Sequence, residues 1–406
     1  MLYTTAICLY ALGVSIASLF NKKARLMIKG HRKIYGILKE SINPNDSYVW
    51  FHAASLGEFE QGRPLMERLR KQHPEYKILL TFFSPSGYEV RKNWEGADVV
   101  CYLPFDIPLS VNRFLNLARP KMAFFIKYEF WMNFLKELHR RDIPAYSVSS
   151  IFRPDQVFFR SYGKPYVRAL HCFTHFFVQN ETSKKLLHTL GITNVTVVGD
   201  TRFDRVIDIY EAAKESPETE KFSRDAQVMV VGSSWEPDEE IIIPYFNAHP
   251  ELKLIIAPHV VNEEHLAFIE RKMERPGIRL SQIKDGEVGN ADYLIIDCYG
   301  LLSGLYRYGS LAYVGGGFGV GVHNVPEAAV YNVPIIIGPN NKRFREVQAL
   351  LKCGGCHEIH NESDFVQVMD FFLKNPALRT EAGQKAGQHI RNNAGAADKI
   401  FNAIPW

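Results

Sequence analysis

Short apolar runs alternate with amphipathic stretches along most of this 406-residue chain, and the alternation limits the fold more than any other feature. The runs in the first half are YVWFHAA, KILLTFFS, DVVCYLP, MAFFIKY, PAYSVSS, HFFVQN and VTVVGD, and those in the second half are QVMVVGSS, LKLIIAP, DYLIIDC, LAYVGGG and VPIIIGP. Strands that are apolar on both faces and separated by helices are typical of parallel sheets covered on both sides. The sequence therefore predicts doubly wound α/β units.

The pattern divides the chain in two, because it covers residues 48–200 and starts again near residue 227. The segment 210–225 is polar, charged and poor in large apolar residues, which is typical of a linker. We expect a Rossmann-like domain over residues 22–210, a linker over 211–226 and a second Rossmann-like domain over 227–406, whose last helix could pack back on the first domain. The two domains are expected to face a cleft. Ligands of such sheets bind beyond the carboxyl ends of the strands.

The first 20 residues carry no charged side chain, and a basic stretch follows them. The basic residues before Glu40 are Lys22, Lys23, Arg25, Lys29, Arg32 and Lys33. About 20 apolar residues can span a bilayer as a helix, and flanking Lys and Arg stay on the cytoplasmic side. A cleavable signal peptide has the opposite order. We expect an uncleaved membrane-anchor helix over residues 1–21, and a helix lying in the interface or packed on the protein is the alternative.

Composition fits a globular protein in a reducing compartment. Hydrophobic residues make up 46% of the chain, so each half can bury a core, and the net charge of +4 is too small to indicate nucleic acid as a partner. The six cysteines form no dense framework. Cys353 and Cys356 make a CxxC without zinc-finger partners, so a loop with two thiols is the simpler interpretation and a metal or redox role the alternative.

Two carboxylates follow predicted strands. Glu58 comes after VWFHAA behind Ser55 and Gly57, and the glycine allows a sharp turn or the close approach of a substrate. A carboxylate there can act as a general base, although a Glu in a first helical turn also stabilises the helix by ~0.3–1 kcal/mol. Glu129 ends the run MAFFIKY two residues after Lys127, and a structural ion pair with an Arg or Lys is its alternative role.

The segment VGGGFGVGVHNVPEAA is the richest in the second half. Gly315, Gly316 and Gly317 follow a predicted strand, and Pro326 fits the first turn of a helix. Such a loop exposes backbone N–H groups toward an anion at a helix N-terminus, although the glycine spacing alone is weak evidence. Glu327 could accept hydrogen bonds from ribose hydroxyls.

Other strand ends in the second half offer groups that suit an acidic nucleotide ligand. The first is a glycine–serine turn before a helix, formed by residues 232–234, and the second, Pro258 and His259, could stack a base. The third, His323 and Asn324, follows the glycine loop. Lys342 begins a basic loop, for which a solvated surface is the alternative interpretation. These residues are Gly232, Ser233, Ser234, Pro258, His259, His323, Asn324 and Lys342. No His or carboxylate cluster has metal-ligand spacing, so we expect group transfer without a metal.

Taken together, the motifs resemble the Kdo transferases of lipopolysaccharide synthesis, which transfer 3-deoxy-D-manno-octulosonic acid (Kdo) from CMP-Kdo to lipid A precursor. The resemblance runs in matching order from the anchor to about residue 350. SLGE, ending at Glu58, looks like that family's Ser-Val-Gly-Glu, and YEFW, Tyr128 to Trp131, resembles its Glu-x-x-Trp segment. GDTRFD resembles Gly-Asn-x-Lys-x-Asp, with Arg202 at the Lys position. The segments GSSWEPDEE, HNVPEAA and GPNNKRFRE resemble the family's Gly-Ser-Thr-x-x-x-Glu-Glu, His-Asn-x-x-Glu-Pro-Ala and Gly-Pro…Phe-Arg-Glu.

The resemblance implies a GT-B glycosyltransferase that binds the acceptor on its first domain and CMP-Kdo on its second. It implies an inverting transfer of Kdo to the glucosamine 6'-hydroxyl of lipid A precursor (lipid IVA) at the cytoplasmic face of the inner membrane, with CMP-Kdo as substrate and no cofactor. Glu58 and Glu129 would be catalytic, Ser55 and Gly57 would contact the acceptor, and Arg202 or Lys342 would pair with the Kdo carboxylate.

The chain also departs from the family's pattern. The family's Pro-Arg-His is Pro258-His259 here, and its Asp-Thr-x-Gly-Glu is Asp297-Cys298-Tyr299-Gly300-Leu301. These differences concern CMP recognition more than the reaction class. The alternatives are another GT-B enzyme that uses a UDP-sugar, as a transferase or epimerase, and a membrane-tethered nucleotide-binding protein without activity.

Overall fold

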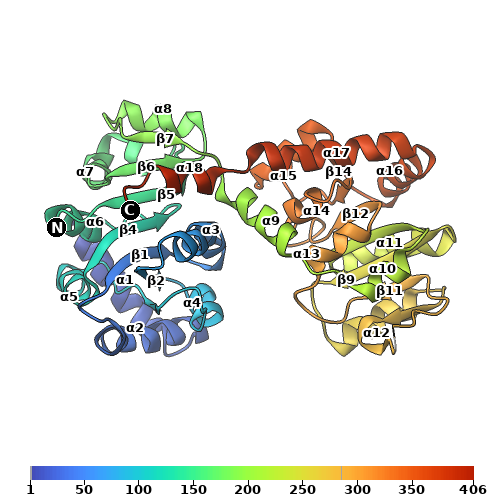
Figure 1. Ribbon diagram of the computed structural model, residues 1–406, viewed down its shortest axis with the longest axis horizontal. Helices are drawn as coiled ribbons and strands as arrows, with labels where there is room; N and C mark the ends of the chain where they lie inside the picture. Colours follow the sequence, from blue (N-terminus) through green and yellow to red (C-terminus); the bar gives the residue numbers. More distant parts are fainter. Residues whose placement is uncertain (1, 285) are drawn as a thin grey trace. The chain divides into compact units, whose positions relative to one another are not determined.

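The computed structural model describes residues 2–284 and 286–406, which form two compact α/β units. Unit 1 comprises residues 1–205 and 394–406, and unit 2 comprises residues 206–393. Each unit contains one parallel sheet with helices packed on it (Figure 1). The two Rossmann-like units predicted from the alternating runs are therefore present.

Unit 1 is built on a sheet with the strand order β3-β2-β1-β4-β5-β6-β7. Its elements are α1 (Leu2–Ala17), α2 (Lys22–Ser41), β1 (Ser47–Ala53), α3 (Leu56–Gln72), β2 (Tyr76–Phe82), α4 (Pro85–Arg91), β3 (Val99–Tyr102), α5 (Pro108–Ala118), β4 (Pro120–Ile126), α6 (Met132–Arg140), β5 (Ala145–Ser150), α7 (Lys164–Leu170), β6 (His175–Val178), α8 (Glu181–Thr189), β7 (Val195–Val197), the start of α9 (Thr201–Ala212) and α18 (Ala396–Asn402).

Unit 2 is built on a sheet with the order β10-β11-β9-β8-β12-β13-β14. Its elements are α10 (Pro217–Ser223), β8 (Gln227–Ser234), α11 (Glu236–Ala248), β9 (Leu252–Pro258), α12 (Glu263–Lys272), β10 (Gly277–Arg279), β11 (Tyr293–Ile295), α13 (Leu302–Leu305), β12 (Leu311–Val314), α14 (Val325–Ala329), β13 (Ile335–Ile337), α15 (Arg345–Cys353), β14 (Cys356–Glu358), α16 (Glu362–Lys374) and α17 (Pro376–Asn393). Short 3-10 turns occupy Val157–Phe159, Ser161–Gly163, Leu280–Gln282 and Tyr306–Tyr308.

Each sheet has a topological switch point, called the winding change below, where successive strands are added on opposite sides of the first strand. In unit 1, β1 pairs with β2 on one side and with β4 on the other, and in unit 2, β8 pairs likewise with β9 and β12. Adjacent loops diverge at such a point, which leaves room for a ligand beyond the carboxyl ends of the strands. The loops after β1, β4, β8 and β12 are therefore the ones that position a site.

The C-terminal helix α18 belongs to unit 1 rather than to the unit that precedes it in the chain. Ile400, Phe401 and Ile404 are buried in one core cluster with Phe124 of β4, and the ring of Trp406 stacks on Phe124 at 5.7 Å between centroids. Burial of these apolar side chains is favourable by roughly 1.5–3 kcal/mol for each large one. The second expected domain, 227–406, is thus shortened at its C-terminal end.

The linker expected over residues 211–226 is not an irregular connection. The boundary between the units falls after Arg205, within α9, and helix α10 begins at Pro217 inside the expected linker. Ser216 caps α10, and Phe222 of this helix is fully buried. The polar composition that suggested a linker reflects the exposed faces of short helices, whereas Val206 of α9 and Phe222 of α10 are buried.

The N-terminal helix α1 ends at Ala17, four residues before the expected anchor helix ends. A separate helix α2 starts after Asn21, whose side chain accepts hydrogen bonds from the N–H groups of Lys23 and Ala24. Along residues 2–284 and 286–406, no single helix has the length and apolar character to cross a membrane, although α1 and α2, bent by 116°, pass that test as a pair. Leu2 and Phe20 are 90% and 87% exposed.

Helix α1 also makes specific contacts with unit 1. The Tyr3 hydroxyl donates a hydrogen bond of 2.7 Å to the buried carboxylate of Asp106, and Asn133 donates to the Thr4 hydroxyl at 3.3 Å. The ring of Tyr10 stacks on Phe83, which follows β2. One side of α1 therefore lies on the protein while apolar side chains on its other side are exposed.

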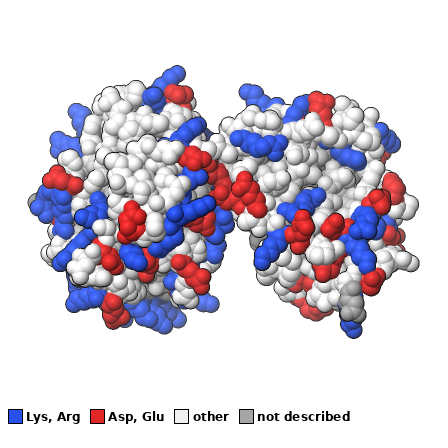
Figure 2. Space-filling view, viewed as in Figure 1, with Lys and Arg blue, Asp and Glu red and all other residues white. Residues whose placement is uncertain are grey.

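Charge is mixed on the surface. In the face that Figure 2 shows, Lys and Arg side chains lie among Asp and Glu side chains on both units. This agrees with the small net charge of +4.

Candidate active site

Glu58 lies in the first turn of α3, directly beyond the carboxyl end of β1. Ser55 is the N-cap residue, but its hydroxyl donates to the Glu58 carboxylate instead of capping the helix backbone. Gly57 is exposed, and a side chain added there would meet only the Ser55 hydroxyl, at 3.9 Å. The structure thus brings Ser55, Gly57 and Glu58 together with open space beside the carboxylate.

Glu129 follows β4, the other strand at the winding change of unit 1. Its carboxylate accepts a hydrogen bond of 2.7 Å from the indole N–H of Trp131 and lies 3.2 Å from Nε2 of His52. The side chain of Glu129 is 13% exposed, and that of His52 on β1 is fully buried. The partners of Glu129 are therefore Trp131 and His52 rather than the Arg or Lys of the alternative interpretation. The sequence interpretation missed His52 because it looked like part of a core strand.

Three residues at or near the carboxyl ends of strands β4, β5 and β8 have strained backbone conformations. Lys127 after β4, Ser149 in β5 and Ser233 in β8 have φ angles of 64°, 55° and 53°, in the left-handed region that costs a non-glycine residue free energy. The pairing of β5 with β6 and of β8 with β9 shifts at Ser149 and at Ser233. Irregular strand ends of this kind re-aim side chains beside functional sites.

Arg202, expected to pair with the carboxylate of Kdo, lies at the start of α9 in unit 1. Its guanidinium donates to Asp200 from Nε at 2.9 Å and from Nη2 at 2.7 Å. Asp200 is buried and also accepts a hydrogen bond of 2.9 Å from Gln61. This geometry holds the start of α9 against α3, and the pairing of Arg202 with the Kdo carboxylate stays a prediction.

In unit 2 the buried carboxylate of Asp238 connects the loops after β8 and β12. It accepts hydrogen bonds from the N–H of Trp235 at 2.9 Å, the Tyr313 hydroxyl at 2.7 Å and the N–H of Gly316 at 2.9 Å. Burial raises the pKa of Asp238, whereas these three donors lower it. Such a carboxylate fixes the N-terminal turn of α11 to the glycine loop.

The glycine loop differs from the anion cradle that its sequence suggested. The Gly315 N–H donates to the carbonyl of Gly232, and the Gly316 N–H donates to Asp238, so both groups are engaged within the protein. A side chain at Gly317 would lie 2.6 Å from Gly338, where the backbone after β13 passes. The first glycines of the loop are therefore required for close packing, and the expectation that their N–H groups face an anion is wrong for Gly315 and Gly316.

The glycine–serine turn after β8 is also committed to internal contacts. Ser234 is buried and donates to Oε1 of buried Glu239 at 2.7 Å, while Nε2 of His265 lies 2.9 Å from Oε2. Burial raises the pKa of Glu239, although Ser234 and His265 lower it. Gly232 lies against Tyr306, whose hydroxyl a side chain there would meet at 2.0 Å. Of this turn, only Ser233 keeps a partly exposed side chain without such a bond.

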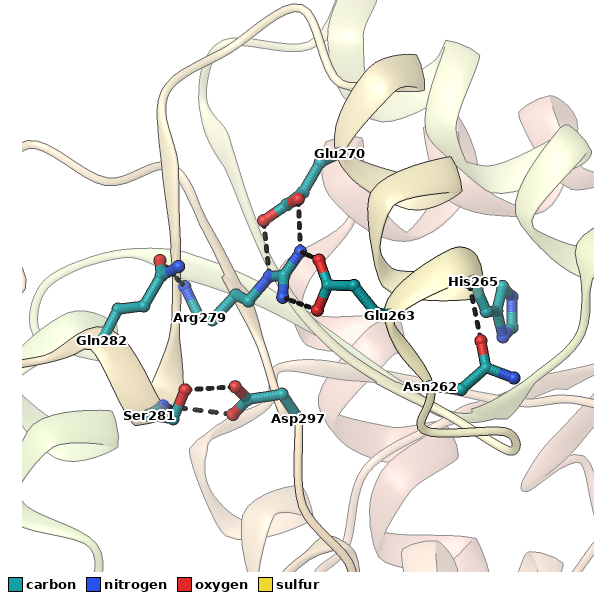
Figure 3. Close-up of polar contacts among 8 residues, drawn as sticks. All are labelled: Asn262, Glu263, His265, Glu270, Arg279, Ser281, Gln282 and Asp297. Carbon is teal, nitrogen blue, oxygen red and sulfur yellow. Dashed lines mark hydrogen bonds and ion pairs between the residues drawn. The ribbon is translucent and has the colours of Figure 1, made fainter.

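The loop after β9 is held by polar contacts around α12 (Figure 3). Asn262 caps the helix by accepting from the N–H of His265 at 2.8 Å. The Arg279 guanidinium binds the carboxylates of Glu263 and Glu270, two turns apart on α12, at 2.6–2.9 Å. Figure 3 also shows the segment after β11, where Asp297 accepts from the backbone and hydroxyl of Ser281.

Three rings stack at the carboxyl edge of the unit 2 sheet. His259 follows Pro258, the last residue of β9, and its ring lies 4.6 Å from that of Trp235 and 4.4 Å from that of His323. The indole N–H of Trp235 is 3.0 Å from Nε2 of His323. Burial, and then the nearby His259, lower the pKa of His323 to about 4, and burial lowers the pKa of His259. The rings are therefore neutral and planar at pH 7, as a platform for a base requires.

The sequence predicted His259 and His323 but not Trp235. This tryptophan also lines a groove of about 410 Å³, together with Val260, His265, Phe268 and Arg271 among others. The signal that could have found Trp235 is its place directly after a strand that ends in a glycine–serine turn.

The remaining predicted donor residues lie on α14 and before α15. The Asn324 amide donates to Glu327 at 2.6 Å, which positions both polar groups at the start of α14. Lys342 is exposed in the loop before α15. The CxxC cysteines lie at the end of α15 and in β14 with their thiols free. In the described part of the chain, no group of three or more His, Cys, Asp and Glu side chains is placed to hold a metal ion.

The comparisons with known proteins concern most of the chain. Residues 29–205 match the family described as 3-deoxy-D-manno-octulosonic-acid transferase (kdotransferase). The chain is 24% identical over 385 residues to the 3-deoxy-D-manno-octulosonic acid transferase of Haemophilus influenzae, covering 91% of this chain and 89% of that one. It is 28% identical over 337 residues to the transferase of the same name from Aquifex aeolicus, covering 81% and 86% of the two chains.

Solved structures show the fold. The UDP-GlcNAc 2-epimerase of Neisseria meningitidis superposes with a TM-score of 0.60 at 14% identity, covering 87% of this chain and 98% of that one. The predicted α/β fold of the GT-B type is therefore confirmed, and at this identity the likeness extends no further than the fold. The matched domain and the two relatives therefore support a Kdo transferase, in agreement with the order of the six motifs.

Proposed function

We propose that this protein transfers Kdo from CMP-Kdo to the glucosamine 6'-hydroxyl of a lipid A precursor, lipid IVA, with inversion at the anomeric carbon. Glu58 takes the proton of the acceptor hydroxyl, the oxygen forms a bond to the anomeric carbon of Kdo, and the bond from that carbon to the phosphate oxygen of CMP breaks. CMP leaves with the bonding electrons. One base suffices, and the reaction forms no covalent enzyme intermediate.

One observation carries the proposal: Glu58 lies beyond the carboxyl end of β1, at the winding change of the sheet, inside the segment that matches the Kdo transferase family. Ser55 donates to one oxygen of its carboxylate, and Gly57 leaves space beside it. A carboxylate so held can accept a proton from a hydroxyl that enters this space. Ser55 and Gly57 are our candidates for contact with the acceptor.

On the donor side, the loops of unit 2 offer groups for CMP-Kdo. Our candidates are Ser233 and the Asn324–Glu327 pair for the phosphate and the ribose, and the stacked rings of His259 and His323 for the base. Exposed Lys342 is a candidate partner for an acidic group of the donor. Fixed donors of this kind stabilise charge on the leaving group, and the proposal includes no metal or cofactor.

We further propose that the protein works at the cytoplasmic face of the inner membrane. The exposed apolar residues of α1, such as Leu9 and Leu12 at 64% and 57% exposure, and the basic residues of α2 support a helix pair that lies on anionic lipid. Such a position brings the acceptor, whose acyl chains stay in the bilayer, to a site on unit 1.

The proposal is tested by incubating detergent-solubilised protein with CMP-Kdo, generated in situ, and tetra-acylated lipid A precursor, followed by mass spectrometry of the lipid. The wild type should add the mass of one or more Kdo units. Glu58→Gln should add none while it still binds CMP, whereas Glu67→Gln, on the same helix, should keep activity. If wild type and Glu58→Gln both leave the lipid unmodified, the function is wrong, and UDP-sugars become the next donors to test.

A further inference from the structure

We infer that buried His52 is a positioning residue, which donates a hydrogen bond from Nε2 to Oε2 of Glu129 and thereby leaves Oε1 of this carboxylate as a fixed acceptor for a substrate hydroxyl. The inference deepens the proposed function and rests on it for the identity of the substrate. It follows from a count of hydrogen-bond donors and acceptors around the imidazole ring.

The Nδ1 side of the ring faces Thr81 of β2. The Thr81 hydroxyl lies 2.9 Å from Nδ1, nearer than the Thr81 carbonyl at 3.2 Å, and it accepts a hydrogen bond of 2.8 Å from the indole N–H of Trp50. Its own hydrogen must therefore point elsewhere, and the alternative acceptor, the carbonyl of Phe51, is farther away at 3.4 Å. With the hydroxyl donating to Nδ1, a neutral His52 carries its proton on Nε2.

The Nε2 side faces the carboxylate. Oε2 of Glu129 lies 3.2 Å from Nε2 of His52 and 2.7 Å from the indole nitrogen of Trp131. The indole nitrogen of Trp131 also lies 3.1 Å from Nε2, so an Nε2 without a proton could accept a hydrogen bond from it. That tautomer would set the Nε2 lone pair against a carboxylate oxygen, and the single indole N–H would have to serve both acceptors. An Nε2–H instead gives Oε2 two donors, so every polar atom of the fully buried ring has a partner.

The arrangement is asymmetric for Glu129. Both donors contact Oε2, and within the described residues no hydrogen bond is made to Oε1. Two N–H donors on one oxygen fix the orientation of the carboxylate. Because Glu129 is 13% exposed beyond the end of β4, Oε1 is the oxygen that remains for a ligand. Glu129 would then orient a sugar hydroxyl, which separates its role from that of the base Glu58.

The chain allows a matched set of variants. The side-chain amide nitrogen of Gln can reach the position of Nε2, whereas that of Asn reaches only the position of Nδ1. His52→Gln therefore keeps a donor for Glu129 and His52→Asn does not. Trp131→Phe removes the second donor and keeps a ring beside Phe83, from which the Trp131 ring lies 4.7 Å. His175→Asn is the control, since His175 of β6 is 2.8 Å from the Thr196 hydroxyl, elsewhere in the sheet.

The first measurement is kcat and KM for the lipid acceptor with the detergent-solubilised full chain, after circular dichroism has shown that each variant is folded. We expect kcat/KM to fall about 10- to 100-fold in His52→Asn, the size of a lost hydrogen bond to a charged group, and to recover in His52→Gln to within about 10-fold of the wild type. His175→Asn should be unchanged. In the Glu129→Gln background, His52→Asn should have little further effect, because both act through one carboxylate.

The second measurement needs no turnover: ¹⁵N NMR of protein labelled at histidine, with the His52 signals assigned by their loss in His52→Gln. A proton on Nε2 supports the inference even if no Kdo transfer is found, which would refute only the proposed function. The positioning role is overturned if Nε2 of His52 carries no proton. It is also overturned if folded His52→Asn and His52→Gln lose kcat/KM equally.

Discussion

Asp238 accepts a hydrogen bond of 2.9 Å from the backbone N–H of Gly316, which ties the first turn of α11 to the glycine loop after β12. The same carboxylate binds the Trp235 N–H and the Tyr313 hydroxyl, so a single buried side chain fixes both loops at the winding change of the unit 2 sheet. The shape of the loop therefore depends on an acidic residue 78 positions earlier in the sequence.

Asp238→Asn should lower the free energy of unfolding by about 2–4 kcal/mol. An asparagine amide has one oxygen that can accept, but its NH₂ group would face a second donor among the three that contact Asp238. That buried donor would lose its acceptor, which is costly. Urea unfolding followed by circular dichroism measures this change. Glu240→Gln on the same helix is the control, since Glu240 is 60% exposed and forms a surface ion pair with Lys272. A loss of stability no larger than in Glu240→Gln would contradict the role of Asp238.

Two glycines of the loop after β12 should respond differently to alanine. A methyl group at Gly317 would lie 2.6 Å from the backbone of Gly338, whereas one at Gly319 would have no neighbour within 4 Å. We expect Gly317→Ala to lower the free energy of unfolding by about 1–3 kcal/mol, the usual cost of overpacking, and to weaken CMP binding. Gly319→Ala should change neither by much. Calorimetric titration with CMP and a thermal melt of both variants test this, and equal behaviour would show that the close packing is unimportant.

His323 should make the stability of the protein depend on pH. Burial and the neighbouring His259 lower its pKa to about 4, below the value near 6.5 of an unfolded histidine. Between these values the unfolded chain binds more protons than the folded one, so the contribution of neutral His323 is complete above about pH 6.5 and is lost as the pH falls toward 4. Urea unfolding of the wild type and of His323→Asn at pH 7.5 and 5 should show a steeper loss for the wild type, and equal losses would contradict the expectation.

Much of the fold could be predicted from apolar runs. Each run quoted in the sequence overlaps a strand, and the run LKLIIAP coincides with β9. Strands β10 and β14 were missed because each has three residues and lies at an edge of the unit 2 sheet, where pairing with one neighbour creates the strand. The placement of α18 on unit 1 depends on tertiary packing around Phe124, which a local pattern does not encode.

Candidate site residues that follow the ends of strands could be named from the sequence, whereas contacts that depend on the pairing of strands could not. Glu58 and the glycine loop could be found because each follows an apolar run. His52 resembled a core residue, since its contacts with Thr81 and Glu129 arise from strands adjacent only in the sheet. The engaged N–H groups of Gly315 and Gly316 were unpredictable for the same reason, because their acceptors come from the segment around β8.

Tyr3 offers a test of how α1 is held. Its hydroxyl donates to Asp106, which is fully buried and also accepts from the N–H groups of Asn133 and Phe134 at the start of α6. Tyr3→Phe removes one donor from this carboxylate and keeps the ring that contacts Tyr166 edge-on. We expect a loss of about 1.5–3 kcal/mol in the free energy of unfolding, typical of a hydrogen bond to a charged group, and faster hydrogen exchange along α1.

Tyr10→Phe is the control for this measurement, because Tyr10 packs on Phe83 and Phe105 by its ring and is 47% exposed. Both variants should be compared in the same detergent by urea unfolding and by hydrogen exchange of the N-terminal peptides. Faster exchange confined to Tyr3→Phe would mean that α1 is held on unit 1 through Asp106 and can present its exposed apolar side to lipid. Equal exchange in the two variants would mean that α1 leaves the protein in detergent, and a position across the bilayer would then become the better hypothesis.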